Sequence, residues 1–267
     1  MAASICRGAK LRTYFCAFTF QIPDLDDFQK QCTGENTILQ WAGVSIVRIS
    51  PTVVVKFGTC VSVPEAKNVI YVAENSKKIP VPEVFAYCTY GPIDRDIGDY
   101  APFSTSYDRQ TKIHVALQLK EYIDELHSIR STLYIGSADH GPATNAILAT
   151  CPFSSEKEFN ETIIEGYQSK APRSHARKYL FRMVEYQEHQ IVFTHGDFRP
   201  QNIMVEDGNV TGIIDWELSG WYPEYWEFAN ALNIWRWQND WGDYLLDILQ
   251  PYYAERSFYL FVSYVLW

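Results

Sequence analysis

The stretch from Phe193 to Trp216, which reads FTHGDFRPQNIMVEDGNVTGIIDW, constrains the fold more strongly than any other part of this 267-residue chain. It contains two short apolar runs, 203–205 and 210–214, with an Asp-Gly pair at 207–208 between them. An Asp-Gly pair between β-branched runs supplies the positive-φ positions that a tight hairpin turn requires. The pattern therefore predicts a loop followed by a β-hairpin.

Three polar side chains are expected at one edge of this hairpin. Asn202 enters it and Asp215 leaves it, so antiparallel pairing brings the two together, and Asp197 lies just before that edge. Two acids and an amide, without a neighbouring histidine pair or cysteine, form an oxygen-rich set of the kind that Mg²⁺ prefers. Taken singly, an Asp after a strand is often a helix cap. We expect His195 to be a packed residue that holds the loop rather than a proton carrier.

The spacing of these residues matches the catalytic loop and metal-binding aspartate of eukaryotic-type kinases. With His-Gly-Asp at 195–197 and Ile-Ile-Asp-Trp-Glu at 213–217, the chain resembles the aminoglycoside phosphotransferase and choline kinase family. Similar runs at IVFTHGD, VTGIIDWE and GWYPEYWE are found in the large fungal group of such domains, and the resemblance extends from about Asn36 to about Leu232. It implies an α+β, two-lobed protein-kinase-like fold. A small antiparallel-sheet N-lobe (24–104) would bind nucleotide, and a larger, mainly helical C-lobe (105–267) would carry the catalytic loop.

The resemblance also implies a role for each site residue. Asp197 would accept or orient the proton of a substrate hydroxyl, while Asn202 and Asp215 would hold Mg²⁺ against the β and γ phosphates of ATP or GTP. Lys56 would contact the α and β phosphates, and Glu65 would orient it through an ion pair.

The residues on the nucleotide side have simpler explanations as well. Lys56 ends the VVVK run and, taken alone, is typical of a solvated strand lysine. Glu65 is favoured in the first turn of a helix for dipole reasons alone. Gly43 could let the backbone approach a phosphate, although a single glycine more commonly marks a turn or bulge between strands.

Periodicity predicts the other elements. Antiparallel strands are expected at 37–50 and 52–57, helices at 64–75, 107–130, 159–164 and 175–187, and an extended segment that ends in a strand at 79–87. The longest helix has its predicted apolar face at Val115, Leu119, Tyr122, Leu126 and Ile129, widened by Ile113, Ala116, Leu117 and Ile123. Pro223 is suited to begin another helix.

Composition excludes several classes of protein. The net charge of −9 argues against a nucleic-acid partner, because phosphate backbones are bound by clusters of Lys and Arg, whereas it would suit a cationic substrate. The six cysteines form no C-x-x-C pair, which favours a reducing compartment and a cytoplasmic location. The apolar patch 14–20 only faintly resembles a targeting sequence, since no small-residue cleavage site follows. The apolar run 258–267 is too short to span a membrane and is expected to be a buried strand or helix.

Three functions follow from these residues. The first is a kinase that transfers the γ-phosphate of ATP or GTP to the hydroxyl of a small molecule. The second is a kinase-fold binding protein without turnover, because segment 91–108 is rich in Gly, Pro, Asp and Ser and contains no further apolar strand to lead into an adenine-binding linker. The third is a metal hydrolase that uses His195 and Asp197, which the spacing of the other histidines does not favour.

An aromatic segment follows Glu217. Its tryptophans and tyrosines, from Trp221 to Trp241, are more typical of a core than of a ligand site. The alternative is that Glu217, Glu224 or Glu227, together with a tryptophan face, holds an ammonium group.

Overall fold

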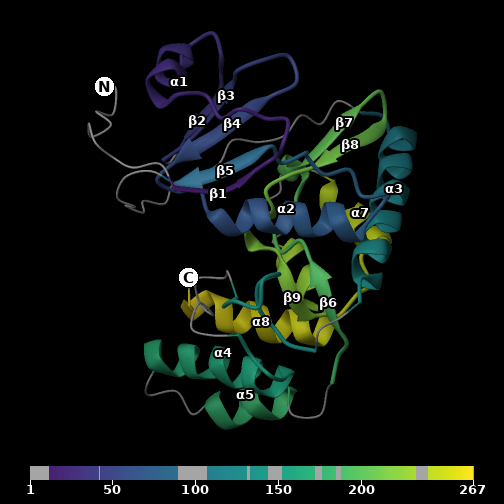
Figure 1. The fold of residues 1–267 in the computed structure, drawn as a ribbon. Coiled ribbons are helices and arrows are strands. Elements are labelled where there is room, and N and C mark those ends of the chain that lie inside the picture. Colours follow the sequence, from purple (N-terminus) through teal and green to yellow (C-terminus); the bar gives the residue numbers. More distant parts are fainter. Residues whose placement is uncertain are drawn as a thin grey trace. The chain divides into compact units, whose positions relative to one another are not determined.

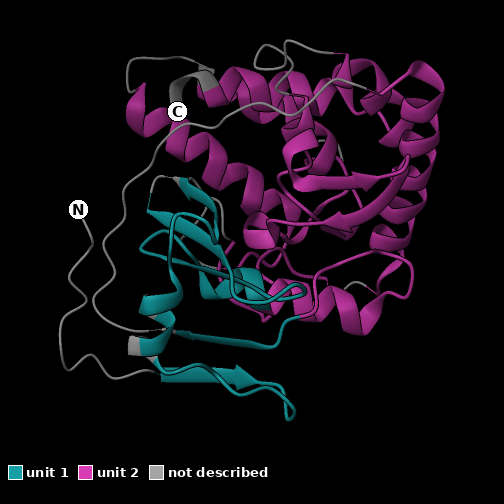
Figure 2. Cartoon of the chain, turned by 90° about the horizontal axis from the view of Figure 1, so that it is seen from above, with its two compact units in different colours: residues 1–66, 84–102 teal, residues 67–83, 103–267 magenta. Residues whose placement is uncertain are grey.

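Helices and antiparallel strands make up the fold (Figure 1), which is known from a computed structural model. The structure describes residues 12–41, 43–89, 107–130, 133–143, 152–171, 176–184, 188–232 and 240–266. The chain forms two units, one of residues 1–66 and 84–102, the other of residues 67–83 and 103–267 (Figure 2). Most of segment 91–108, where the sequence shows no further strand, lies outside the described residues.

The smaller unit contains two antiparallel sheets. One joins β1 (Arg12–Cys16) to β5 (Ala86–Thr89), and the other has the order β2 (Thr37–Trp41), β3 (Val44–Arg48), β4 (Val54–Gly58). Helix α1 (Leu25–Gln31) packs on the second sheet, because the buried ring of Phe28 meets the ring of Phe57 edge-on at 5.0 Å. The strands predicted at 37–50 and 52–57 are thus confirmed, whereas β1 was not predicted.

Gly43 explains why the first predicted strand is two strands. It turns the chain between β2 and β3 with a φ of 78°, and a Cβ at this position would lie 2.6 Å from Thr59 Oγ1. Only glycine fits such a position without strain. The turn interpretation of Gly43 is therefore confirmed.

Two long helices were predicted closely. Helix α2 (Val63–Asn75) has the predicted bounds to within a residue, and α3 (Arg109–Ser128) begins at the N-cap Asp108, which accepts the backbone N–H groups of Gln110 and Thr111. The buried face of α3 consists of Ala116, Leu119, Ile123 and Leu126.

The predicted apolar face of α3 was too wide. Leu117 is 58% exposed and Ile113 is 43% exposed. The buried positions are spaced by three and four residues and form one stripe, while Leu117 is turned roughly 100° further around the helix than Ala116. Apolar character alone did not reveal which side of the helix faces the core.

The larger unit contains two more antiparallel pairs. Strand β6 (Ile191–Thr194) pairs with β9 (Gly220–Pro223), and β7 (Ile203–Glu206) pairs with β8 (Asn209–Ile213). Asp207 and Gly208 both have positive φ, at 49° and 75°, so the predicted hairpin turn is confirmed.

The helix predicted to begin at Pro223 was wrong. Pro223 ends β9 opposite Ile191, and the N–H of the next residue, Glu224, donates to Gln190 O at 2.8 Å. A proline is tolerated at such a strand end because it removes no interior ladder bond. Helix α6 (Trp226–Ala231) follows, and with it the aromatic segment enters the core.

Aromatic rings and the last helices complete the core. The Trp226 ring stacks on Tyr222 at 5.1 Å and meets Phe159 at 5.1 Å and Tyr259 at 5.0 Å, so the prediction of an aromatic core is confirmed for 221–228. Trp235 and Trp237 lie outside the described residues. The helices around this cluster are α4 (Glu156–Lys170), α5 (Ala176–Val184), α7 (Trp241–Ile248) and α8 (Tyr253–Leu266). Helix α4 is longer than predicted. Residues 258–266 of the apolar run 258–267 belong to α8, and Trp267 lies outside the described residues. Within the described ranges, no helix combines the length and the apolar character needed to cross a bilayer.

A partly buried histidine ties α4 and α8 to the start of β6. His189 Nδ1 lies 2.9 Å from Glu156 Oε1, and its Nε2 lies 3.6 Å from Glu255 Oε1. Burial lowers the pKa of His189, but the hydrogen bond and charge of Glu156, with the charges of Glu255 and Glu224, outweigh it and raise the pKa above its ordinary value. The protonated imidazole is thus favoured in the folded state.

We predict that His189→Gln lowers stability in a pH-dependent way. The contribution of a group whose pKa is raised on folding is fully present below its unfolded value of about 6.5 and is lost as the pH rises through the folded value. The thermal midpoint of the variant should therefore fall furthest below that of the wild type at about pH 6, and the gap should narrow towards about pH 9. His114→Gln, at an exposed position on α3, is the control. An equal gap at both pH values would contradict the ion-pair assignment.

Candidate active site

His195, the first residue after β6, links the loop 195–202 to the end of β8. Its Nε2 lies 3.0 Å from Ile214 O, and its Nδ1 accepts the backbone N–H of Asp197 at 3.3 Å. This pattern places the hydrogen on Nε2 of a neutral ring, and burial lowers the pKa of His195 in the same sense. The predicted packing role is confirmed. Both ring nitrogens are engaged in hydrogen bonds with the backbone, which argues against a hydrolase that uses His195 as a metal ligand.

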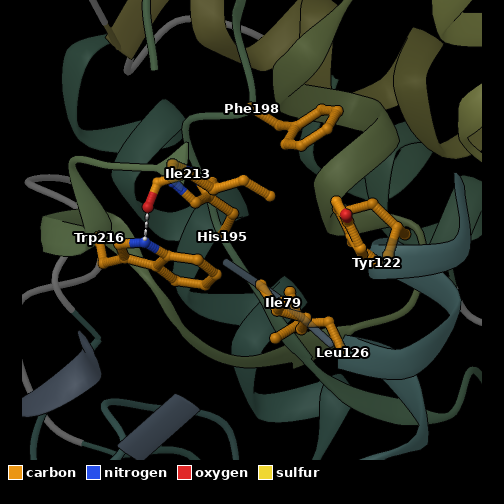
Figure 3. Close-up of a pocket in the computed structure, with 8 residues that line it drawn as sticks. Ile79, Tyr122, Leu126, His195, Phe198, Ile213 and Trp216 are labelled. Carbon is orange, nitrogen blue, oxygen red and sulfur yellow. Dashed lines mark hydrogen bonds between the residues drawn. The ribbon is translucent and has the colours of Figure 1, made fainter. Parts of the chain in front are cut away.

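The surroundings of His195 are apolar (Figure 3). A small gap beside the ring is lined by Ile79, Tyr122, Leu126, Phe198, Ile213 and Trp216. The Trp216 ring meets the imidazole at 4.6 Å and donates its own Nε1–H to Ile213 O at 2.8 Å. A charged imidazole would be costly in such surroundings.

A buried carboxylate holds the backbone of the same loop. Glu227 of α6 is 1% exposed and accepts the N–H of His195 at 2.5 Å and that of Gly196 at 3.1 Å. Burial raises the pKa of Glu227 to about 7, although the two backbone hydrogen bonds oppose the shift. The carboxylate thus fixes the two residues that precede Asp197.

Glu227 was not predicted in this role. The suggestion that it might hold a ligand's ammonium group was wrong, because its side chain is buried and bonded to backbone. The available signal was an acid in the middle of an apolar aromatic run, Trp226-Glu227-Phe228, since a buried charge requires a partner.

Gly196 allows the loop to pass close to the segment after β8. It has a φ of 83°, and a Cβ there would lie 2.3 Å from the carbonyl oxygen of Leu218. Any larger residue would push the loop away from that segment.

Asp197 and Asn202 meet as predicted. Asn202 Nδ2 donates to Asp197 Oδ2 at 3.0 Å and to Asp197 O at 2.9 Å. Asn202 ends the short turn η1 (Pro200–Asn202) and is 4% exposed, so its side chain is held close to the loop.

Arg199 brings the third predicted residue into the same group. Its Nη2 lies 2.9 Å from Asp197 Oδ2 and 3.8 Å from Asp215 Oδ2. Asp197, Asn202 and Asp215 therefore lie around one arginine. Arg199 was not predicted as a site residue. The signal in the sequence was a cation that lies two residues after Asp197 and before Asp215, the two predicted acids.

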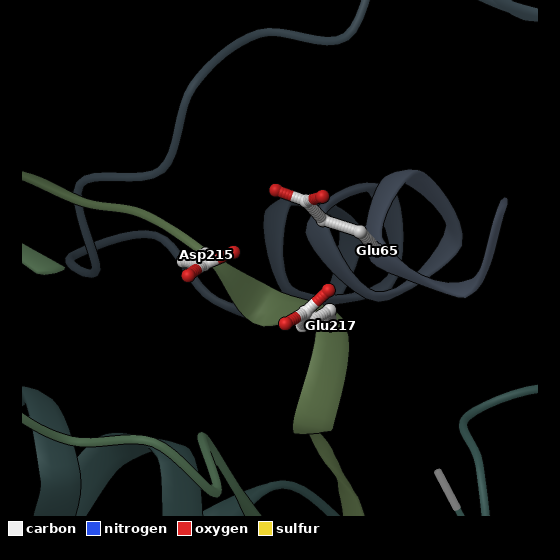
Figure 4. Close-up of side chains that lie close together, drawn as sticks. All are labelled: Glu65, Asp215 and Glu217. Atoms are coloured by element: carbon white, nitrogen blue, oxygen red, sulfur yellow. The ribbon is translucent and has the colours of Figure 1, made fainter. Parts of the chain in front are cut away.

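Asp215 has an unusual backbone. It follows β8 with φ 66° and ψ 56°, a left-handed conformation that costs a non-glycine residue about 1–3 kcal/mol. The next turn, η2 (Trp216–Leu218), carries Glu217, and Figure 4 shows Asp215 and Glu217 on this segment. Such strain persists only where neighbouring contacts fix the chain.

Side chains bonded to backbone carbonyls supply those contacts. Asn68 of α2, 1% exposed, donates to Trp216 O at 2.7 Å and to Ser219 O at 3.2 Å. Ser219 Oγ in turn donates to His195 O at 2.8 Å. The segment that carries Asp215 is thereby bonded both to α2 and to the catalytic loop.

The smaller unit contains the predicted lysine–glutamate pair. Lys56 of β4, opposite Ile46 of β3, places its Nζ 2.8 Å from both carboxylate oxygens of Glu65. Glu65 lies in the first turn of α2 (Figure 4). With side-chain exposures of 26% and 15%, the two are partly buried, so Lys56 is not the solvated lysine that its strand alone suggested.

The donors in the larger unit fit a magnesium ion. Asn202 offers an amide oxygen and Asp215 a carboxylate, which are the hard oxygen ligands that Mg²⁺ takes in proteins. Asp197 and Asp215 both lie within reach of one guanidinium nitrogen, so a single cation can interact with both carboxylates. These residues could hold such an ion.

The sequence matches a known protein family over most of its length. Residues 46–259 match the model of the APH family, described as the phosphotransferase enzyme family. An aminoglycoside 3'-phosphotransferase of Enterococcus faecalis is 26% identical over 177 residues, and one of Staphylococcus aureus is 26% identical over 174 residues. These matches cover 64% and 62% of this chain, and 65% and 64% of the relatives. The chain thus spans just under two thirds of the length of the curated relatives that it matches.

Solved structures show the same fold at low sequence identity. A thermostable mutant of aminoglycoside phosphotransferase APH(4)-Ia in its apo form matches with a TM-score of 0.56 and 16% identity, over 85% of this chain and 83% of that one. ADP-bound APH(2'')-Ib matches with a TM-score of 0.54 and 12% identity, over 91% and 89% of the two chains. The chain belongs to the phosphotransferase enzyme family and has the α+β, kinase-like fold of the aminoglycoside phosphotransferases.

Proposed function

We propose that this protein transfers the γ-phosphoryl group of ATP to a hydroxyl group of a small molecule. The observation that carries the proposal is the meeting of Asp197 and Asp215 at one guanidinium nitrogen, with Asn202 bonded to Asp197. Enzymatic phosphoryl transfer relies on positioning and charge neutralisation, which such a group of residues provides. Membership of the phosphotransferase enzyme family supports the same reaction.

Each residue in the loop then has a role. Asp197 accepts or orients the proton of the acceptor hydroxyl. Asn202 and Asp215 would hold Mg²⁺, whose charge, when it is bound, offsets that of the β and γ phosphates. The contacts of Glu227 and His195 keep Asp197 in place, because they fix the backbone immediately before it.

The nucleotide side is assigned to Lys56, Glu65 and Gly43. Lys56 neutralises the α and β phosphates, Glu65 orients it, and the turn at Gly43 covers the phosphates. Two proteins of the same fold support ATP as the donor: the ADP-bound APH(2'')-Ib, and an APH(4)-Ia mutant in complex with AMP-PNP and hygromycin B, which matches with a TM-score of 0.50.

The acceptor class that fits best is a hydroxyl compound with amino groups. The curated relatives are named for aminoglycosides, and the net charge of −9 attracts cationic molecules. Choline and amino sugars belong to the same class. A reaction that consumes ATP, in a chain whose cysteines at 16, 32 and 88 are free thiols, is in keeping with a cytoplasmic location.

We predict that Asp197→Asn lowers the rate of phosphoryl transfer by about 10²–10⁴, the usual contribution of a positioned general base. ADP release would be measured with ATP and a panel of aminoglycosides, choline and amino sugars. Binding of ATP should persist in the variant, because the contact between Asn202 and the backbone O of Asp197 does not need the carboxylate.

Asp207→Asn is the control for this substitution. Asp207 lies exposed in the hairpin turn with a φ of 49°, a conformation that asparagine tolerates. Its turnover should equal that of the wild type. A wild-type rate in Asp197→Asn would remove Asp197 from the reaction.

We also predict that Mg²⁺-ATP stabilises the protein and that Lys56→Met loses much of this effect. A ligand at 100 times its Kd adds about 2.7 kcal/mol to the free energy of unfolding. Thermal unfolding with and without Mg²⁺-ATP measures the difference. Lys78→Met is the control, because the Lys78 side chain is 67% exposed and lies 4.0 Å from Glu125. Absence of any shift in the wild type would contradict nucleotide binding, and a shift without turnover of any acceptor would favour a binding protein.

A further inference from the structure

Arg199 occupies an unusual place for an arginine. One nitrogen, Nη2, lies 2.9 Å from Asp197 Oδ2 and 3.8 Å from Asp215 Oδ2. All three side chains are largely shielded from water, with exposures of 13% for Arg199, 26% for Asp197 and 18% for Asp215. Its charge is permanent, because a guanidinium is not deprotonated in proteins.

One guanidinium nitrogen of Arg199 lies near two carboxylates. Its 2.9 Å contact to Asp197 Oδ2 is within hydrogen-bond distance, whereas its 3.8 Å contact to Asp215 Oδ2 is too long for a hydrogen bond. The contact to Asp215 is therefore the weaker and more easily broken of the two.

The backbone keeps Arg199 beside the site. Arg199 has an extended conformation with φ −139° and ψ 160°, and its carbonyl accepts the N–H of Asn202 at 3.0 Å. The side chain can therefore change partner without movement of the loop that carries Asp197 and Asn202.

We propose that Arg199 is an internal counter-ion that partly offsets the charges of Asp197 and Asp215 and must release Asp215 before a divalent cation binds there. This inference rests on the proposed function, since it takes Asp215 as a metal ligand. The reason is electrostatic: without a cation the two carboxylates would repel each other, and a guanidinium and a metal ion compete for the same oxygen, Asp215 Oδ2. Arg199 thus lowers the affinity of the site for metal when no nucleotide is bound.

The counter-ion role is tested by a double-mutant cycle in metal-free buffer with a chelator. The four proteins are the wild type, Arg199→Met, Asp215→Asn and the double variant, and the measurement is the thermal midpoint. Arg199→Met should lower the midpoint in both backgrounds, because the contact to Asp197 is present in both, but by less in Asp215→Asn, because coupled residues are not additive. Equal effects in both backgrounds would overturn the role.

The competition is tested by titration of Mn²⁺ alone into the wild type and Arg199→Met, with binding measured by calorimetry. We expect Arg199→Met to bind Mn²⁺ about tenfold more tightly, within the usual range for coupled binding events, and Arg199→Lys to stay near the wild type. Arg177→Met is the control, since it removes an exposed arginine that lies 3.6 Å from Glu165. Equal or weaker binding by Arg199→Met would overturn the competition.

The two failures can be told apart. If Asp215→Asn binds Mn²⁺ as well as the wild type does, Asp215 is not a metal ligand, and both the metal site of the proposed function and the competition are wrong. The double-mutant cycle needs no metal, so it decides the counter-ion role independently of that result.

Discussion

The contact between the buried carboxylate of Glu227 and the N–H groups of His195 and Gly196 is the interaction on which the site depends. A carboxylate inside a protein is costly unless donors surround it, and a loop keeps one conformation only where its backbone groups have partners. The two N–H groups stabilise the buried carboxylate, and the carboxylate holds the loop in one conformation. Asp197 follows directly after this contact, so an acid on α6 helps to set the position of its backbone.

A second set of contacts fixes the segment after β8. The side chain of His195 bonds to Ile214 O, that of Asn68 on α2 bonds to Trp216 O, and that of Ser219 bonds to His195 O. These bonds to backbone carbonyls join the loop at His195, helix α2 and the segment after β8. These bonds sustain the left-handed conformation of Asp215. With both segments fixed, two acids and an amide converge without a disulfide or a long regular element. The positions of Asp197 and Asp215 then depend on hydrogen bonds made by the backbone of the segments that carry them.

Local chemistry accounts for what could be predicted from the sequence. The Asp-Gly turn at 207–208, the helical spacing of α2 and the return of Asn202 and Asp215 to one hairpin edge depend on neighbouring residues, and all three are present. Distant pairing accounts for what was missed. Strand β1 forms by pairing with β5, and Pro223 lies in a strand because that strand pairs with β6. The role of Glu227 depends on the backbone of the loop at His195, on another element. The exposed side of α3 likewise depends on what packs against it.

Amide hydrogen exchange at His195 and Gly196 tests most directly whether Glu227 holds the loop. At a pH above the value of about 7 to which burial raises the pKa of Glu227, its side chain is ionised. Glu227→Gln keeps the shape of the side chain but loses this charge and turns an NH₂ group towards two N–H donors; hydrogen bonds to charged groups are worth about 1.5–3 kcal/mol. Both amides should exchange at least about tenfold faster in Glu227→Gln, while that of Val192 in β6 stays unchanged. Glu224→Gln, three residues earlier, should have no such effect on these amides. Unchanged exchange of His195 and Gly196 in Glu227→Gln would contradict the account.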